Sequence, residues 1–313
     1  MDRLDIRILG QLYRGVSKIG FRPDVKGMYG SMAEKLEIDE DTVRKRVDRL
    51  HSMGVIRGWQ LVVNPHVFGL DTYAVWMTVD SELKIEETMR KIRLVHGILT
   101  IAREMGNVVS MGMVCENESV FRKRVELISE LTGGKQLASY AVAQPKSEVE
   151  PTSTDWQIIN AITPDPLGSY TRVAEKLGLS SRTVQRRITR LINGKVIFFL
   201  PNVDFSHLEG ASWVSLLVSY AESGFKDRIE RSIFTKFEDY VLQVAWSDAG
   251  YGYFEFIIPN IHLVEEIADW TRTQRGIGDV RVNFNYERQN FYDDVLDEIK
   301  ASRVKGTRAL PAE

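Results

Sequence analysis

Three arginines in the second half of the chain, Arg182, Arg186 and Arg190, are spaced four residues apart. On an α-helix this spacing places them in one row, and their mutual repulsion slightly destabilises an isolated helix. A polyanion would relieve the repulsion, because guanidinium groups bind phosphates and make bidentate hydrogen bonds to guanine in the major groove. The row therefore predicts a contact with double-stranded DNA, and the alternative is an ordinary solvated helix face.

The matching positions earlier in the chain carry a mixed set of charges. Asp41, Lys45, Asp48 and Arg49 lie on the side of a predicted helix opposite its apolar stripe,. The two acids would repel phosphate or accept a hydrogen bond from cytosine N4. We therefore expect the later helix to carry most of the affinity. The predicted DNA-binding residues are Arg182, Thr183, Arg186, Arg187 and Arg190 in the later helix and Thr42, Lys45, Arg46 and Arg49 in the earlier one.

Two of these arginines, Arg46 and Arg187, flank the apolar stripe instead of lying opposite it. Each either reaches a phosphate at the edge of the groove or extends its alkyl chain along the helix packing. Asp39 and Ser180 come just before the two helices. They are typical N-cap residues, which accept hydrogen bonds from the first free amides of a helix. Such amides can also hold a phosphate.

Short amphipathic helices must position these side chains. We expect a first helix near the amino terminus, a second around 31–36 and a third from 39 to 54,. The apolar stripes are formed by Ile6, Leu9 and Leu12 in the first helix and by Val43, Val47 and Leu50 in the third. After the third helix, Val55-Ile56 and the run 59–63 predict a strand pair, or wing. Three helices and a wing predict a winged helix-turn-helix.

The arrangement occurs twice along the chain. The segment 32–36, Met-Ala-Glu-Lys-Leu, returns 141 positions later as Val-Ala-Glu-Lys-Leu, and this offset holds without a gap as far as Gly69 and Gly210. The first helices match at an offset of 150, so the first copy has nine extra residues between its first two helices. They fall in a stretch with glycine and proline, 15–27, which predicts a longer loop. The polar segment 145–151, bounded by prolines, has the composition of a linker,.

Behind each helix-turn-helix lies the pattern strand-helix-strand-strand-helix-strand, the ferredoxin-like order. The expected elements are 73–79, 85–95, 98–102, 108–114, 120–131 and 137–142, and then 213–220, 226–237, 241–246, 253–258, 263–273 and 280–286. A terminal helix is expected at 291–299. The predicted fold is α+β, with winged helix-turn-helix domains at 1–69 and 152–210 and ferredoxin-like βαββαβ domains at 70–145 and 211–290. The C-terminal helix is expected to end at about 302.

These motifs together resemble the Lrp/AsnC family of transcriptional regulators. The resemblance rests on Asp-x-x-Ile-Leu at 5–9, Ala-Glu-Lys-Leu in the second helix and Thr-Val-x-x-Arg-Val/Ile-x-x-Leu in the third, and it covers nearly the whole chain twice. Family members usually carry one copy, so the resemblance implies a fused pair that acts as an internal pseudo-dimer with its ferredoxin-like sheets packed together. Such dimers bind near-palindromic half-sites about one helical turn apart. Because the two recognition helices differ, we expect an asymmetric site. Further association of fused chains stays open.

The resemblance also implies control by a small-molecule effector bound between the ferredoxin-like domains, near the turn before the third strand of each sheet. The family's Gly-x-Tyr-Asp signature is altered there, to Gly-Asn-Val-Val at 106–109 and Gly-Tyr-Gly-Tyr at 250–253, which argues against amino-acid sensing of the usual kind. The expected rim residues are Ser247, Asp248, Gly250, Tyr251, Gly106 and Asn107. Nearby aromatic residues such as Trp213, Tyr253 and Phe256 either line a pocket or form the core.

The alternative is an enzyme, because siroheme decarboxylases look like the same family and carry out tetrapyrrole chemistry between ferredoxin-like domains. Such a site needs cations for the substrate carboxylates and an acid–base group. The candidates are His66, His207, Arg103 and Arg281, and the two histidines occupy matching positions of the copies. The acid-free face of the later recognition helix favours DNA, because an enzyme has no need of such a face.

Composition limits the remaining classes of function. The chain has 41 Lys+Arg and 43 Asp+Glu, a net charge of −2, which excludes binding through bulk positive charge,. Its one cysteine, Cys115, excludes an intrachain disulfide and a cysteine-clustered zinc site,. No apolar run approaches the roughly 18–20 residues that span a membrane, and no catalytic motif is found. We expect a cytoplasmic, non-enzymatic DNA-binding regulator without cofactor or metal.

Overall fold

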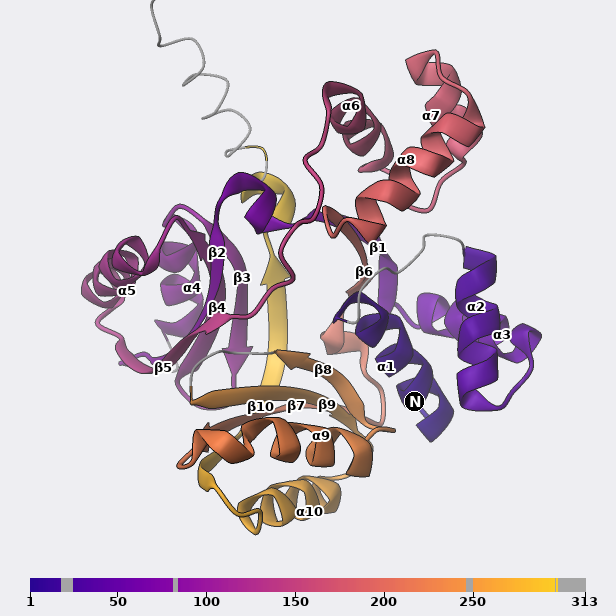
Figure 1. The fold of residues 1–313 in the computed structure, drawn as a ribbon. Helices are drawn as coiled ribbons and strands as arrows, with labels where there is room; N and C mark the ends of the chain where they lie inside the picture. The colour runs from indigo at the N-terminus through magenta and orange to yellow at the C-terminus, as the bar shows by residue number, and fades with distance from the viewer. Residues whose placement is uncertain (18–24, 81–83, 246–249, 296, 298–313) are drawn as a thin grey trace, which may run out of the picture. The chain divides into compact units, whose positions relative to one another are not determined.

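The computed structural model describes residues 1–313 except 18–24, 81–83, 246–249, 296 and 298–313 (Figure 1). The chain divides into two compact units, which we describe separately. Unit 1 comprises Met1–Asn64 and Pro145–Asn285, and unit 2 comprises Pro65–Gln144 and the chain from Tyr286 onward. Unit 1 therefore contains both helix-turn-helix segments and the second βαββαβ segment. The limits of the four predicted domains stay predictions.

Both helix-turn-helix segments consist of three helices. The first has α1 (Arg3–Ser17), α2 (Val25–Leu36) and α3 (Glu40–Ser52), and the second has α6 (Ser153–Ile162), α7 (Tyr170–Leu177) and α8 (Ser181–Asn193). The predicted apolar stripes of α1 and α3 are buried. The predicted loop at 15–27 is wrong at both ends, because α1 continues to Ser17 and α2 begins at Val25. Met28 and Tyr29 are buried one turn before Met32, and this packing extends the helix toward its N-terminus,.

The predicted wing hairpins are wrong. Each copy has one continuous strand, β1 (Ile56–Val63) or β6 (Ile197–Val203), and the two strands pair antiparallel with each other. The pairing buries Leu61 opposite Phe199. The pairing is also symmetric. At the 141-residue offset, Gly58 corresponds to Phe199 and Leu61 corresponds to Asn202. The pairs Gly58–Asn202 and Leu61–Phe199 are therefore equivalent when the two copies are exchanged. The register irregularity between Ile56 and Gly58 is a bulge, with Gly58 at φ +143°, and not the turn of a hairpin,.

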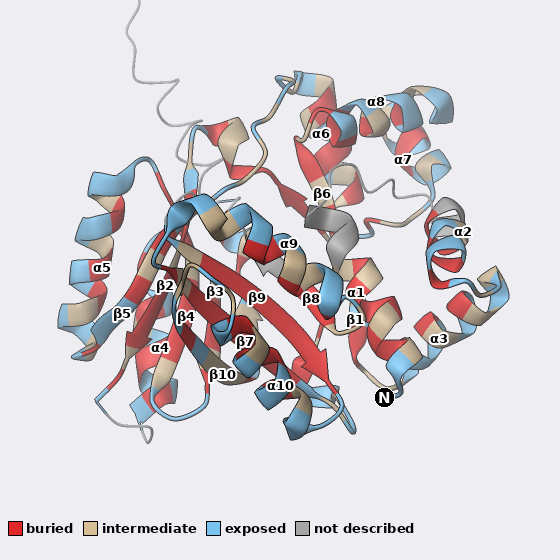
Figure 2. Ribbon diagram, turned by 60° about the horizontal axis from the view of Figure 1, so that its bottom comes forward, coloured by how far each residue is buried: buried red, intermediate tan, exposed pale blue. Residues whose placement is uncertain are grey.

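In unit 1 the βαββαβ order is β7 (Ser212–Tyr220), α9 (Lys226–Lys236), β8 (Val241–Ala245), β9 (Tyr251–Ile258), α10 (Ile261–Arg272) and β10 (Ile277–Asn290). The strands lie side by side in the order β10-β7-β9-β8. Helices α9 and α10 lie over one face of this sheet (Figure 2). Their buried side chains, among them Ile233 and Ile267, form a core with Leu216, Phe254 and Phe256. The predicted element order is confirmed here.

Unit 2 has the same order: β2 (Asp71–Thr78), α4 (Ile85–Arg93), β3 (Ile98–Glu104), β4 (Val108–Cys115), α5 (Glu118–Thr132) and β5 (Lys135–Val142). Its strands are arranged β5-β2-β4-β3. The last strand of the chain, β10, is longer than the predicted 280–286 and continues beyond Asn285 into unit 2. Of the predicted C-terminal helix, residues 292–295 are helical, and its end lies outside the described residues. None of the described helices is long and apolar enough to cross a membrane.

Helix α1 is anchored within unit 1 to the second βαββαβ segment. It packs against β8, and its Arg7 forms an ion pair with Asp239 at 2.9 Å between Nε and Oδ1. Arg3 pairs with the same carboxylate. The matching positions of α6 hold Ser153 and Gln157, which carry no charge. The first helix-turn-helix therefore has an ionic anchor that the second cannot form from the same positions.

Candidate nucleic-acid interface

A buried carboxylate at the start of α6 holds the recognition helix α8 of the second copy. Asp155 is fully buried, and its carboxylate forms ion pairs with two arginines. Nη1 of Arg187 lies 2.9 Å from one carboxylate oxygen, and Nη1 of Arg190 lies 3.0 Å from the other. Thr152 caps the helix: its hydroxyl oxygen accepts a hydrogen bond from the Asp155 amide at 3.3 Å, and its own amide and hydroxyl donate to the Asp155 carboxylate at 2.8 and 2.7 Å. The two arginines thus share one carboxylate, and their guanidinium groups remain partly exposed.

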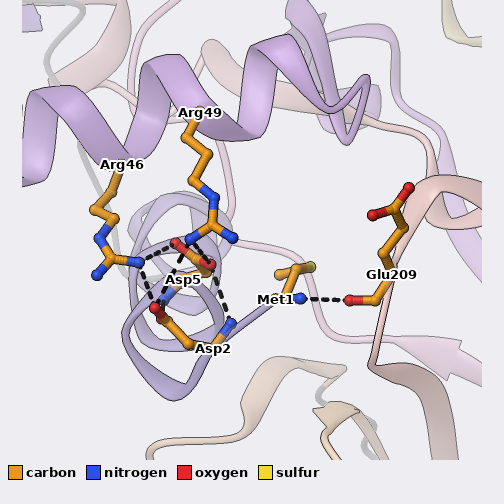
Figure 3. Close-up of polar contacts among 6 residues, drawn as sticks. All are labelled: Met1, Asp2, Asp5, Arg46, Arg49 and Glu209. Carbon is orange, nitrogen blue, oxygen red and sulfur yellow. Dashed lines mark hydrogen bonds and ion pairs between the residues drawn. The ribbon is translucent and has the colours of Figure 1, made fainter.

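The first copy repeats this network with one additional acid (Figure 3). The buried Asp5 receives Arg46 at 3.0 Å and Arg49 at 3.1 Å. Asp2, which stands where the second copy has Thr152, also pairs with Arg46 and lies 3.8 Å from Arg49. The amine of Met1 donates to the main-chain oxygen of Glu209 and so turns away from the cluster.

Hydrogen bonding sets the protonation of these carboxyl groups. Burial alone would raise the pKa of Asp155, but hydrogen bonds from Thr152 and from Arg187 outweigh it and hold the pKa below its ordinary value,. The pKa of Asp2 is lowered in the same way: burial opposes the shift, and the amide of Asp5 and the guanidinium of Arg46 produce it. Both carboxylates are therefore charged at neutral pH.

The exposed face of α8 is cationic. Arg182 and Arg186 are exposed, and neither forms an ion pair with any residue that the structure describes. Arg190, the third member of the predicted row, is not unopposed as the local sequence suggested, because Asp155 lies 35 positions earlier in the chain. Of the three arginines in the row, Arg182 and Arg186 thus form no ion pair with a described residue, whereas Arg190, like its neighbour Arg187, is held by Asp155 of α6.

The matching face of α3 carries compensating charges. Lys45, Asp41 and Asp48 are all exposed. Arg44 pairs with Glu40 at 2.8 Å within the helix and also lies over the ring of Tyr29. This face has acids beside its cations, as the sequence predicted. Its electrostatic attraction for phosphate is therefore much weaker than that of α8.

The two predicted threonines serve as partners of the N-caps. Thr42 donates its amide and its hydroxyl to Asp39, both at 2.7 Å. The amide of Thr183 donates to Ser180 at 3.1 Å, and the two hydroxyls lie 2.9 Å apart. Capping by Asp39 and Ser180 is therefore confirmed. The hydroxyl of Thr42 thus donates its proton to Asp39, within the protein.

The sequence analysis missed four residues that contact the predicted DNA-binding arginines: Asp2, Asp5, Thr152 and Asp155. The signal was present in the sequence, because an aspartate recurs at offset 150 as the first residue of the repeated motif at 5–9 and 155–159. Its pairing with arginines depends on how two helices cross, and spacing along one helix does not show this.

The predicted effector residues are only partly described. Ser247 and Asp248 lie outside the described residues. In unit 1, Gly250 is exposed and its carbonyl accepts a hydrogen bond from the amide of Tyr220 at 2.8 Å, and Tyr251 begins β9. In unit 2, Gly106 and Asn107 lie in the β3–β4 turn, and the side-chain amide of Asn107 connects this turn to the end of β2 by donating to the Val79 carbonyl at 2.7 Å.

The four residues considered for tetrapyrrole chemistry each have an acidic neighbour. In unit 1, His207 lies 3.3 Å from Asp204 and also packs near Gly54, and Arg281 pairs with Asp279 at 3.2 Å. In unit 2, His66 lies 3.9 Å from Asp71, and Arg103 lies 3.5 Å from Glu86. Of the aromatic residues, Phe256 belongs to the core beneath α9 and α10. Within the described part of the chain, no group of histidine, cysteine and acidic residues is placed to hold a metal ion.

Comparison with known proteins gives a family match for the second copy. Residues 152–192 match the sequence profile of the AsnC-type helix-turn-helix domain. The chain is 29% identical over 133 residues to the HTH-type transcriptional regulator Ptr1 of Methanocaldococcus jannaschii, covering 42% of this chain and 84% of that protein. It is 22% identical over 145 residues to the regulatory protein AsnC of Haemophilus influenzae, covering 44% of this chain and 91% of that protein.

A solved structure matches over nearly the whole chain. The crystal structure of the siroheme decarboxylase NirDL aligns with 95% of this chain and 99% of its own, at a TM-score of 0.54 and 14% identity. At this identity the likeness concerns the fold alone. The regulators match less than half of the chain, whereas the fold of this enzyme aligns with nearly all of it.

Proposed function

We propose that this protein is a DNA-binding transcriptional regulator that presents two helix-turn-helix segments to DNA from a single chain. The AsnC-type domain at 152–192 and the similarity to two named regulators support this function. The observation that carries it is the exposed face of α8, where Arg182 and Arg186 have no acid to neutralise them among the described residues. A helix with such a face is suited to the major groove, where arginines contact phosphates and guanines.

The two copies have unequal roles in this proposal. Helix α8 supplies most of the affinity, while α3 contributes weakly or selects bases that offer a donor to Asp41 or Asp48. The symmetric pairing of β1 with β6 supports an internal pseudo-dimer, because it relates the two helix-turn-helix segments of unit 1 as two subunits would be related. Unequal recognition helices in such an arrangement favour an asymmetric operator. Control by a small-molecule effector at the β8–β9 side remains part of the proposal.

The test is a binding titration with fragments of genomic DNA over a series of salt concentrations. Displacement of counterions makes the logarithm of the binding constant fall linearly with the logarithm of salt, by about 0.9 for each phosphate neutralised. We expect sequence-selective retention with a slope that corresponds to several phosphates. Retention that is absent, or that does not depend on salt, would contradict the proposal.

A second candidate function is tetrapyrrole decarboxylation, favoured by the match of the fold to NirDL over nearly the whole chain. The same purified sample distinguishes the two functions by its absorbance between about 350 and 600 nm after addition of haem, since haem-type groups absorb in that window. Stoichiometric binding of haem without retention of DNA would favour the enzyme.

A further inference from the structure

In each copy, two arginines of the recognition helix contact acids at the start of the first helix, and the net charge of this cluster differs by one between the copies. In the second copy, Arg187 and Arg190 face one carboxylate, that of Asp155. In the first copy, the matching Arg46 and Arg49 face two, those of Asp5 and Asp2. The second cluster therefore keeps a net charge of +1, whereas the first is neutral.

The difference comes from a single position, the residue that caps the first helix of each copy. Asp2 and Thr152 stand at the same place of the repeat and make the same local bonds: the amide three residues on donates to Asp2 at 3.0 Å and to Thr152 at 3.3 Å. Aspartate and threonine are both good caps, so the choice between them affects the helix start little. It affects the neighbouring arginines strongly, because only aspartate brings a charge.

The surroundings do not restore the missing acid in the second copy. Glu150 is the nearest upstream acid, and it accepts a hydrogen bond from Arg190 through its main-chain oxygen at 3.4 Å. Its carboxylate forms no ion pair with any described residue. Both guanidinium groups are partly exposed, although the Nε of Arg187 is buried and has no hydrogen-bond partner among the described residues.

We propose that the residue at position 152 makes Arg187 and Arg190 a binding site for a DNA backbone phosphate, and that Asp2 closes the corresponding site in the first copy. The inference rests on the proposed function. The arginine pair flanks the exposed Arg182 and Arg186, and the sugar–phosphate backbone runs at that flank when a recognition helix lies in the major groove. Asp155 holds both guanidinium groups in place, so little side-chain entropy is lost when a phosphate binds.

The experiment compares Thr152→Asp with Thr152→Asn by fluorescence anisotropy on a duplex that the wild-type protein retains. Both variants keep a capping side chain of similar size, and only one adds a charge. We expect Thr152→Asp to weaken binding about tenfold and to reduce the salt slope by about 0.9, the value of one phosphate. Thr152→Asn should stay within about twofold of wild type, since a cap is retained. Thermal unfolding of both variants checks that the domain is folded.

The reciprocal variant is Asp2→Thr, which should increase the salt slope by about 0.9 because the first cluster gains a net charge. Equal binding by Thr152→Asp and Thr152→Asn would overturn the inference for the second copy, and an unchanged slope for Asp2→Thr would overturn it for the first. A wild-type protein that retains no DNA would instead contradict the proposed function itself, so the two failures are distinguishable.

Discussion

Asp155 connects α6 with α8 through two arginines, and its removal should loosen the second helix-turn-helix. Replacement by asparagine keeps the shape but leaves Arg187 and Arg190 without a charged partner. Because hydrogen bonds to charged groups contribute roughly 1.5–3 kcal/mol, we expect Asp155→Asn to lower the free energy of unfolding by about 2–3 kcal/mol in urea denaturation. The control is Asp165→Asn, which breaks the exposed pair with Arg172 and should cost less than about 1 kcal/mol,. Equal losses would refute the role of Asp155.

The same carboxylate should make stability depend on pH in the acid range. The pKa of Asp155 is lower in the folded protein than its usual value near 3.9, so its stabilising effect is complete above that value,. The effect is lost as the pH falls through the lower pKa of the folded state. In the asparagine variant this part of the acid dependence should disappear, whereas a parallel acid profile for the two proteins would contradict the assignment. Chemical denaturation at a series of pH values between about 2 and 6 measures it.

For single residues, the sequence predicted the positions of the arginines better than it predicted their acidic partners. The spacing of Arg182 and Arg186 was enough to place them on one exposed face, because a helix has a fixed rotation per residue. The partner of Arg190 lies on another helix. No periodicity within α8 contains that information, so the expectation of an unopposed row failed at its last member.

Among the elements, strands β1 and β6 should make the two helix-turn-helix segments depend on each other. Phe199 is fully buried opposite Leu61, and replacing a buried phenylalanine by alanine costs about 3–5 kcal/mol,. We expect Phe199→Ala to destabilise both segments together, so that α3 and α8 lose protection from amide exchange in parallel. Asn202→Ala, at an exposed position of the same strand, should change stability by no more than about 0.5 kcal/mol,. Loss of protection confined to the second copy would disprove this coupling.

The order of helices and strands was predictable, since apolar periodicity determines which face of each element is buried. The apolar pattern of one strand does not determine which other strand it pairs with. The apolar residues within 56–63 are compatible with a hairpin inside one copy or with pairing to the other copy, because either arrangement can bury these side chains. Contacts between residues about 140 positions apart decided between them.

At the scale of the whole molecule, ion pairs should hold the first helix-turn-helix to the sheet that α1 contacts. The second helix-turn-helix has no such ion pairs from the matching positions of α6. The anchor is Asp239 with Arg3 and Arg7, and exposed pairs of this kind contribute about 0.2–1 kcal/mol,. Asp239→Asn should therefore accelerate amide exchange in α1 and leave α6 unchanged. Asp269→Asn, which breaks the exposed pair with Arg272 on α10, is the matched control. Equal acceleration in α1 and α6 would be inconsistent with an anchor specific to the first copy.

The division of labour between the two recognition helices is the central claim, and paired charge reversals test it most directly. Arg186→Glu and Lys45→Glu change the same charge at matching positions of α8 and α3. Measured on one duplex across a salt series, Arg186→Glu should weaken binding by at least about tenfold and reduce the salt slope by about 0.9 or more. Lys45→Glu should have a clearly smaller effect on both quantities. Equal losses in the two variants would contradict the account.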